Sequence, residues 1–256
     1  IISGARPVYV PLLEPDFEFD PDALRKAFTD NTKAVIINTP HNPSGKVFTR
    51  EELRLVSELC NRYGALVVTD EIYEHILYDD ARHVSPASVE GLQDRTITIS
   101  GMSKTYSATG WRVGWTIAPE PILGAIRKIH DFLTVGAPAP LQEAGVVAMR
   151  LPQEYYRKLA DFYKHKRDVI CAELAKVGFR PFVPKGAYYV LTDFTAISDV
   201  DDTQFAIDLL EKIGVATVPG SSFYSTEAPG RSKVRFAFCK TEETLREAIE
   251  RLETMT

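Results

Sequence analysis

A lysine set among small and hydroxyl-bearing residues is the most informative feature of this sequence. Lys104 lies within SGMSKTYSATGWRVGW (residues 100–115). Ser100 and Ser103 precede it, and Arg112 follows eight residues later. Small residues let a backbone approach a ligand closely, hydroxyl groups donate to phosphate oxygens, and a guanidinium offers a planar pair of donors to the same oxygens. The stretch therefore predicts a site where an amine meets a phosphate-bearing ligand.

Short apolar runs and one amphipathic segment predict the strands and the helix that position this site. Three strands and one helix are predicted in this part of the chain, at residues 34–38 (AVIIN), 65–69 (ALVVT), 96–99 (TITI) and 49–63. Strands separated by helices of this length favour right-handed crossovers and a mainly parallel sheet. We therefore expect an α/β fold with helices on both faces of the sheet.

Three polar residues fall just past the predicted strands. Asn42 follows the first strand, Asp70 follows the second, and Lys104 lies a few residues beyond the third. Loops at the carboxyl ends of parallel strands meet in one crevice, where open α/β sheets bind their ligands. Taken alone, Asp70 is also typical of a helix N-cap and Asn42 of a turn. The order and spacing of the three residues together carry the hypothesis of a shared site.

The pattern changes after Pro138, where longer helices are predicted. The elements expected there are helices at 141–149, 153–176, 203–213 and 241–252, and strands at 188–193 and 233–238. They predict a second, smaller α/β domain, with the chain divided into residues 1–160 and 161–256. In the last strand Val234 and Phe236 share one face, so the side chain of Arg235 points to the opposite face. An arginine that points into the protein there needs an anion as its partner.

Composition excludes several classes of function. The net charge is −5 and no basic run is present, so nucleic acid is not an expected partner. No apolar run approaches the roughly 20 residues of a membrane span. The three cysteines are far apart and the five histidines lack metal-ligand spacing, so we expect reduced thiols, a cytoplasmic protein and no metal site. The P-loop, G-x-G-x-x-G and G-x-S-x-G motifs are absent from the sequence.

Three stretches together resemble the class I and II aminotransferases, the aspartate aminotransferase superfamily of pyridoxal-phosphate (PLP) enzymes with the type I fold. SGMSKTYSATGWRVGW resembles the family's cofactor-lysine motif, TPHNPSG its N-P-[ST]-G loop and VVTDEIYEHILYD its D-E-x-Y segment. The resemblance covers essentially the whole chain. It implies PLP as the cofactor and transfer of an amino group from an L-amino acid to a 2-oxo acid, through a PLP Schiff base on Lys104.

The resemblance also implies roles for individual residues. Lys104 would hold the cofactor and move a proton between the substrate and the cofactor. Asp70 would lie against the pyridine nitrogen and keep it protonated, while Tyr73 and Asn42 would share the 3′ oxygen of the ring. These assignments make Lys104, Asp70 and Tyr73 the expected catalytic residues.

The phosphate and the substrate carboxylate have their own expected partners. Arg112 matches the family's phosphate-binding arginine, accompanied by Ser100 or Ser103; some members carry this hydroxyl where the present chain has Gly101. Arg235, in KVRFAF, matches the arginine that binds the substrate α-carboxylate, and Asn42 is the second residue expected to bind the substrate. The loop VPGSSF resembles one near the family's substrate entrance.

The beginning of the chain and the resemblance together raise three hypotheses. The sequence opens on IISGARPVYVPL, which is typical of a strand in mid-course, so we expect a truncated member that lacks roughly the family's first third. The first hypothesis is an aminotransferase, expected to be a homodimer and closest to the branch acting on aspartate, aromatic amino acids, kynurenine or methionine. The alternatives are a PLP-dependent β-lyase, and an inactive fragment or aminotransferase-like sensor domain of a regulator.

Overall fold

The chain divides into two structural units. The computed structural model describes residues 3–255. Among these, the first unit contains 3–40, 47–77 and 81–159, and the second contains 41–46, 78–80 and 160–255. The two short segments belong to the second unit because they contact residues far along the sequence. Lys185 N donates to Gly45 O at 3.0 Å, and Arg167 Nη1 donates to Asp79 Oδ2 at 2.6 Å. The second unit therefore includes two short segments from the amino-terminal part of the chain.

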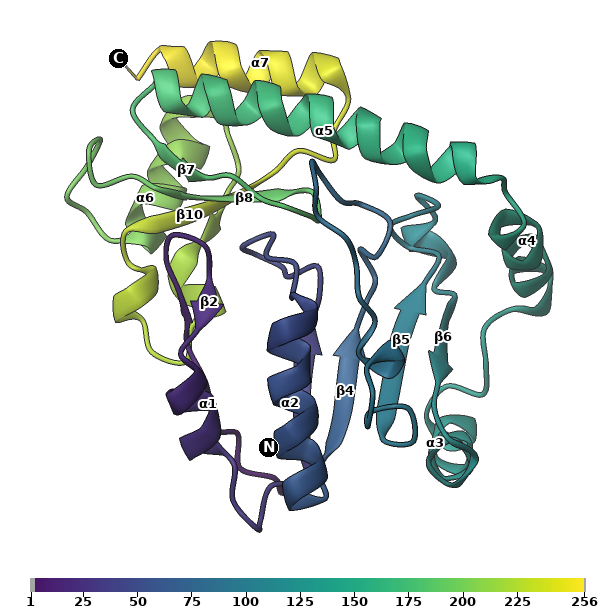
Figure 1. Cartoon of the computed structure of the whole chain (residues 1–256). Helices are drawn as coiled ribbons and strands as arrows, with labels where there is room; N and C mark the ends of the chain where they lie inside the picture. The colour runs from purple at the N-terminus through teal and green to yellow at the C-terminus, as the bar shows by residue number, and fades with distance from the viewer. Residues whose placement is uncertain (1–2, 256) are drawn as a thin grey trace. The chain divides into compact units, whose positions relative to one another are not determined.

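The first unit is built on a four-stranded sheet in the order β3–β4–β5–β6 (Figure 1). Its strands are β3 (Ala34–Asn38), β4 (Leu66–Asp70), β5 (Thr96–Gly101) and β6 (Gly114–Ile117). β3, β4 and β5 are parallel, and β6 runs antiparallel to β5. The predicted parallel α/β sheet is confirmed, and β6 was not expected.

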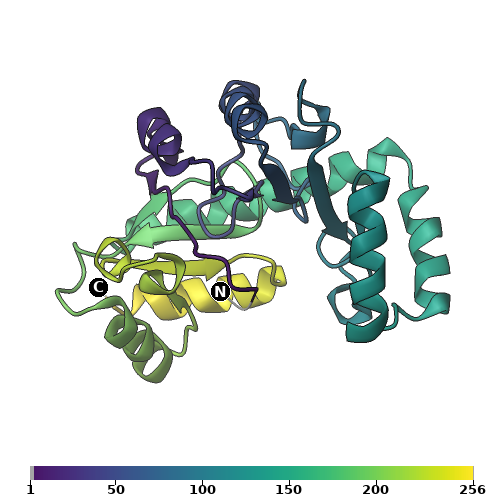
Figure 2. The same cartoon turned by 90° about the horizontal axis from the view of Figure 1, so that it is seen from below.

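The helices of the first unit include one whose ends the sequence marks clearly. The helical segments are α1 (Pro21–Ala27), α2 (Arg50–Tyr63), η1 (Pro86–Ser88), η2 (Thr109–Trp111), α3 (Glu120–Leu133) and α4 (Ala139–Met149). Thr49 and Glu52 form a capping box at the start of α2, and Gly64 ends it with φ +66°. Leu53 and Val56 of α2 join the buried core. α1 and α2 lie on the same side of the sheet (Figure 1 and Figure 2).

The strand expected at the beginning of the chain is wrong for residues 3–11, while residues 1–2 lie outside the described part. Only β1 (Leu12–Leu13) forms there, antiparallel to β2 (Glu18–Phe19). Pro7 lacks the N–H that a ladder needs. Val8 and Tyr9 are 58% and 64% exposed, so no packed face stabilises an extended pairing.

The second unit contains an antiparallel sheet in the order β7–β8–β10–β9. Its strands are β7 (Arg180–Phe182), β8 (Tyr189–Asp193), β9 (Val218–Pro219) and β10 (Lys233–Ala237). Its helical segments are α5 (Gln153–Lys176), which begins in the first unit, α6 (Asp202–Asp208), η3 (Leu209–Ile213), η4 (Gly220–Phe223), η5 (Ala228–Gly230) and α7 (Glu242–Glu253). The helix predicted at 203–213 is α-helical only in its first part, because the turn over Leu209–Ile213 is a π-helix.

Aromatic rings form much of the core of the second unit. Phe205 of α6 stacks on Phe194 with ring centroids 4.0 Å apart, and it meets Phe179 edge-on at 6.0 Å. Phe179 in turn meets Phe236 of β10 at 5.3 Å. Edge-to-face and offset contacts of this kind add to the stabilisation from burial. The core therefore fixes β10, the strand that carries Arg235.

Candidate active site

Asp70 ends β4, the strand that lies between β3 and β5 (Figure 1). Its carbonyl oxygen accepts hydrogen bonds from Thr39 N at 3.0 Å and Asn38 Nδ2 at 3.1 Å. Its Oδ1 accepts from Ile72 N at 3.1 Å. The half-buried carboxylate is therefore held at the carboxyl edge of the sheet, where ligands bind in folds of this class.

Tyr73 and Lys104 lie close together beyond the same edge. Lys104 follows the end of β5 by three residues, and its Nζ lies 5.9 Å from the centroid of the Tyr73 ring. Tyr73 is only 3% exposed, whereas Lys104 is half-buried. The structure thus brings a carboxylate, a phenol and an amine onto the loops that follow two adjacent parallel strands.

The loop that carries Lys104 is closed at its base by the β5–β6 pairing. Met102 N donates to Val113 O at 3.0 Å, and Gly101 pairs with Gly114. A Cβ on Gly101 would lie 2.9 Å from Val113 O, closer than real Cβ atoms come to backbone. The tight strand pairing therefore favours glycine at this position.

Two residues with left-handed backbone lie within this loop. Ser107 and Arg112 both have φ +53°, a conformation that non-glycine residues rarely adopt. Backbone strain of this kind concentrates at binding sites. Arg112 Nη1 donates to Thr109 O at 2.9 Å, and the Thr109 hydroxyl donates to Ser103 O at 2.7 Å. These bonds tie the arginine end of the loop to the serine next to Lys104.

Tyrosines from the start of α5 hold the peptide units on the other side of Lys104. The Tyr155 hydroxyl donates to Thr105 O at 2.7 Å, and the hydroxyls of Tyr106 and Tyr156 lie 2.8 Å apart. Burial, with the hydrogen bond to Tyr156, raises the pKa of Tyr106 above its usual range. The Tyr106 phenol therefore stays protonated and can keep its hydrogen bond at physiological pH. The lysine loop is consequently anchored on both sides.

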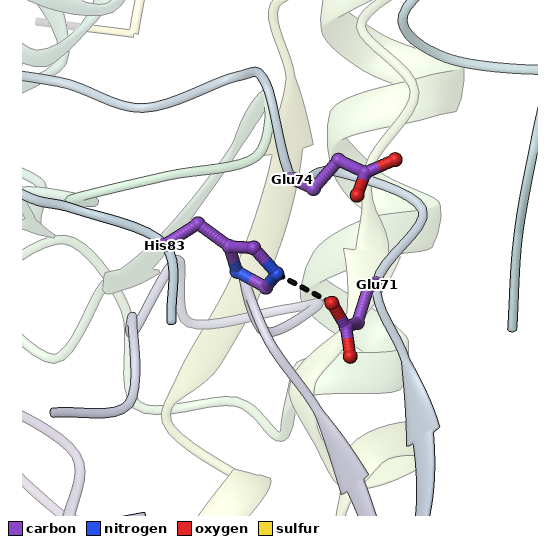
Figure 3. Close-up of side chains that lie close together, drawn as sticks. All are labelled: Glu71, Glu74 and His83. Carbon is purple, nitrogen blue, oxygen red and sulfur yellow. Dashed lines mark hydrogen bonds and ion pairs between the residues drawn. The ribbon is translucent and has the colours of Figure 1, made fainter. Parts of the chain in front are cut away.

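Ser100, one of the two serines expected at the phosphate, points to a different group. Its buried hydroxyl donates to Glu74 Oε1 at 2.9 Å. Glu74 belongs to a cluster with Glu71 and His83 whose ligand atoms lie within 4.8 Å of one another (Figure 3). Sequence reasoning missed this cluster because His83 lies in an irregular segment. The only available signal was a glutamate immediately after Asp70.

The hydrogen bonds of the cluster favour a network of hydrogen-bonded side chains over a metal site. His83 Nε2 and Glu71 Oε2 are 2.6 Å apart, as the dashed line in Figure 3 marks, and the Ser85 hydroxyl donates to Glu71 Oε1 at 2.9 Å. Two ligands at about 2.1 Å from one ion would normally lie farther apart than this. A proton between Nε2 and the carboxylate accounts for the spacing directly.

The second unit brings together the other two predicted residues. Arg235 Nη1 donates to Asn42 Oδ1 at 2.7 Å. The guanidinium carbon lies 4.1 Å from the ring centroid of Tyr189 and 4.9 Å from that of Phe223. Aromatic faces attract a guanidinium and shield it from water. Tyr189 was not predicted to be part of this site. Leu191 of β8 pairs with Arg235, and Tyr189 lies two residues before Leu191, so the side chains of Tyr189 and Arg235 lie on the same face of the sheet.

The loop that holds Asn42 is fixed by its own backbone. His41 N donates to Lys46 O and Gly45 N to His41 O, both at 2.8 Å. Gly45 has φ +71°, and a Cβ there would lie 2.1 Å from the Cβ of Pro184, so only glycine fits. Burial, with the charge of Lys46, lowers the pKa of His41 to about 4, so this ring is neutral at physiological pH.

Comparison with known proteins identifies the family to which this chain is similar. The family model "Aminotransferase class I and II" matches residues 1–252. "Probable N-succinyldiaminopimelate aminotransferase" of Mycobacterium tuberculosis is 38% identical over 265 residues, which cover 99% of this chain and 66% of that protein. Human kynurenine–oxoglutarate transaminase 1 is 34% identical over 283 residues, which cover 98% of this chain and 67% of its own.

A solved structure shows the same fold. The N-succinyldiaminopimelate aminotransferase from Mycobacterium tuberculosis matches with a TM-score of 0.95 and 37% identity, covering 100% of this chain and 67% of that one. The chain spans 66% of the length of the mycobacterial relative to which it is similar. The family match over residues 1–252 and the lysine loop lead to one conclusion. The chain belongs to the class I and II aminotransferases.

Proposed function

We propose that the protein containing this chain is a PLP-dependent aminotransferase that moves an amino group from an L-amino acid to a 2-oxo acid. The observation that carries the proposal is Lys104 on the loop after β5, with Tyr73 5.9 Å from its Nζ and Asp70 at the end of the neighbouring strand β4. Membership of the family supports the reaction class. The names of the relatives support α-amino acids as substrates, since both act on compounds of this class.

The donor set of the first unit fits PLP. A carboxylate at the end of β4 suits a protonated ring nitrogen, a buried phenol suits a ring oxygen, and an amine suits an aldehyde. Arg112 and Ser103, tied together through Thr109, suit the phosphate. Because the Ser100 hydroxyl donates to Glu74, we assign the phosphate hydroxyl to Ser103.

Lys104, Asp70 and Tyr73 would then each have a separate role in the reaction. PLP supplies an electron sink that makes the α-hydrogen of the amino acid acidic. Lys104 Nζ holds the cofactor and, once released, moves the proton taken from the α-carbon. Asp70 keeps a proton on the ring nitrogen, and Tyr73 donates its phenol hydrogen to the ring oxygen.

The residues of the second unit would bind the substrate. Arg235 is the group proposed for the α-carboxylate, because a guanidinium forms two parallel hydrogen bonds with a carboxylate. Asn42 accepts from Arg235 through Oδ1, so its Nδ2 is the end that can donate to a ligand oxygen. Neither residue reads the substrate side chain, so a panel of amino acids is needed to find the preferred one.

Absorbance spectroscopy tests the proposed reaction. The complete gene product loaded with PLP should lose its visible band when an L-amino acid is added and regain it with a 2-oxo acid. Both half-reactions should proceed without release of ammonia. Ammonia and pyruvate from a cysteine conjugate would instead indicate a β-lyase. A stable visible band with every amino acid tested would count against both activities.

We further propose that the protein is a homodimer. Phe132 and Leu133 at the end of α3 are 93% and 77% exposed, and Val135 just beyond is 83% exposed. Large exposed apolar groups in a cluster mark interaction surfaces. Sedimentation of the complete gene product should give a dimer, weakened about 10-fold or more by Phe132→Asp but not by Ile207→Asp on α6. A monomer at all concentrations would contradict the proposal.

A cytoplasmic location is also proposed. Cys60 and Cys171 are buried free thiols whose pKa values burial raises to about 11 and about 12, so they are poor nucleophiles. Reduced, unreactive cysteines are typical of cytosolic proteins. Within residues 3–255, every helix is too short or too polar to cross a membrane. Recovery of the protein in a membrane or secreted fraction would contradict the location.

A further inference from the structure

The residue next to Asp70 is a carboxylate that is almost completely buried. Glu71 is 1% exposed, although a buried charge is unfavourable unless it is paired and hydrogen-bonded. Both of its oxygens have partners: His83 Nε2 at 2.6 Å and the Ser85 hydroxyl at 2.9 Å. A carboxylate oxygen accepts, so this contact corresponds to the His83 tautomer that carries its proton on Nε2. The carboxylate is thus held in one orientation by a segment 12 to 14 residues away.

A second carboxylate continues the network toward the lysine loop. Glu74 Oε1 accepts from Ser100 Oγ at 2.9 Å, and Ser100 lies on β5, the strand that leads to Lys104. Burial raises the pKa of Glu74, with the nearby Glu71 charge acting in the same direction and the Ser100 hydrogen bond and His83 opposing it. Glu71 and Glu74 therefore attach the turn after β4 to two other segments of the first unit.

The backbone of this turn carries two of the proposed catalytic residues. Glu71 N donates to Ile99 O at 2.8 Å, and Glu74 N donates to Glu71 O at 2.9 Å. Asp70 precedes the first glutamate and Tyr73 lies between the two. A shift of either glutamate would therefore move the carboxylate and the phenol. Active sites need such support, since a displacement near 1 Å can lower a rate about 100-fold.

We propose that Glu71 and His83 are positioning residues that fix Asp70 and Tyr73 for the reaction. The inference rests on the proposed aminotransferase function. Neither residue is assigned a contact with cofactor or substrate. They act through the turn between Asp70 and Glu74, and Ser85 assists by holding the second oxygen of Glu71.

Variants of the complete gene product, loaded with PLP, test the proposal. Glu71→Gln and His83→Ala should each lower kcat about 10- to 100-fold while KM for the 2-oxo acid changes by less than about 3-fold. The visible circular dichroism band of the bound cofactor should weaken, because ring orientation is no longer fixed. The double variant should be no worse than either single one, since each already removes the charge-assisted hydrogen bond between the two side chains. His83→Gln restores a donor at a similar reach and should recover most of kcat.

A matched control separates positioning from stability. Ser57 is buried on α2 and its hydroxyl donates to Glu90 O at 2.6 Å, away from the turn. Ser57→Ala should lower the melting temperature while kcat and the circular dichroism band stay unchanged. If His83→Ala does not fold, Ser85→Ala removes one hydrogen bond to Glu71 and should give a smaller loss of the same kind.

Three results would overturn the proposal. One is unchanged kcat and circular dichroism in Glu71→Gln and Ser85→Ala. Another is a loss of kcat in Ser57→Ala that is as large as the loss in Glu71→Gln. A third is a stoichiometric metal ion in the purified protein that is lost in Glu71→Gln, which would make the cluster a metal site. An unmutated protein that binds PLP but does not transaminate would instead contradict the proposed function.

Discussion

Replacement of Lys104 by alanine is expected to lower kcat/KM for transamination at least about 10⁴-fold, because it removes both the cofactor's covalent anchor and the proton-transfer group. Lys104→Arg should be equally inactive. Arginine keeps the positive charge, but its guanidinium is not deprotonated in proteins and cannot take the place of a neutral amine. Comparison of the two variants therefore distinguishes a need for the amine from a need for charge near Tyr73.

Chemical labelling gives an independent measurement for the same residue. Borohydride reduction of the PLP-loaded protein, followed by peptide mass spectrometry, should place the pyridoxyl group on Lys104. Lys158→Ala is a suitable control, because that side chain is 76% exposed on α5 and pairs with Glu154 at 2.7 Å. A label on a different lysine would contradict the assignment. So would a Lys104→Ala variant that retains more than about a hundredth of the activity.

Local pattern accounts for the parts of the fold that were predicted well. The strand predicted at 34–38 coincides with β3, because five consecutive residues are apolar or neutral and turn-forming residues follow. The helix predicted from Thr49 has its cap at that residue, since the Thr49 and Glu52 side chains can satisfy the first amide groups. Lys104, Asp70 and Tyr73 could be placed near one edge because they follow parallel strands.

Contacts between distant segments account for what was not predicted. Glu71 and His83 meet through an irregular segment that has no periodic pattern, and Tyr189 meets Arg235 across the pairing of β8 with β10. β6 has four residues, too few for a clear alternation, and it forms because it can pair with β5. Tertiary packing decides each of these features, and a single sequence carries no direct record of it.

Replacement of Arg235 by glutamine is expected to lower kcat/KM for amino acids about 10²- to 10⁴-fold, the range for losing a desolvated, hydrogen-bonded charge pair. The guanidinium lies against the rings of Tyr189 and Phe223, which exclude water and strengthen its attraction for a carboxylate. Arg235→Lys should be intermediate, because an ammonium keeps the charge but cannot form two parallel hydrogen bonds.

The choice of substrate tests whether Arg235 reads the α-carboxylate. In the unmutated protein, an amino acid should be preferred strongly over the amine that lacks only the carboxylate. In Arg235→Gln this preference should largely disappear, while PLP content stays unchanged. Arg180→Gln is the matched control, because Arg180 lies on β7 of the same sheet with its side chain 66% exposed and 3.5 Å from Asp193. If Arg235→Gln loses activity equally toward both compounds, the carboxylate is bound elsewhere and Arg235 supports the Asn42 loop instead.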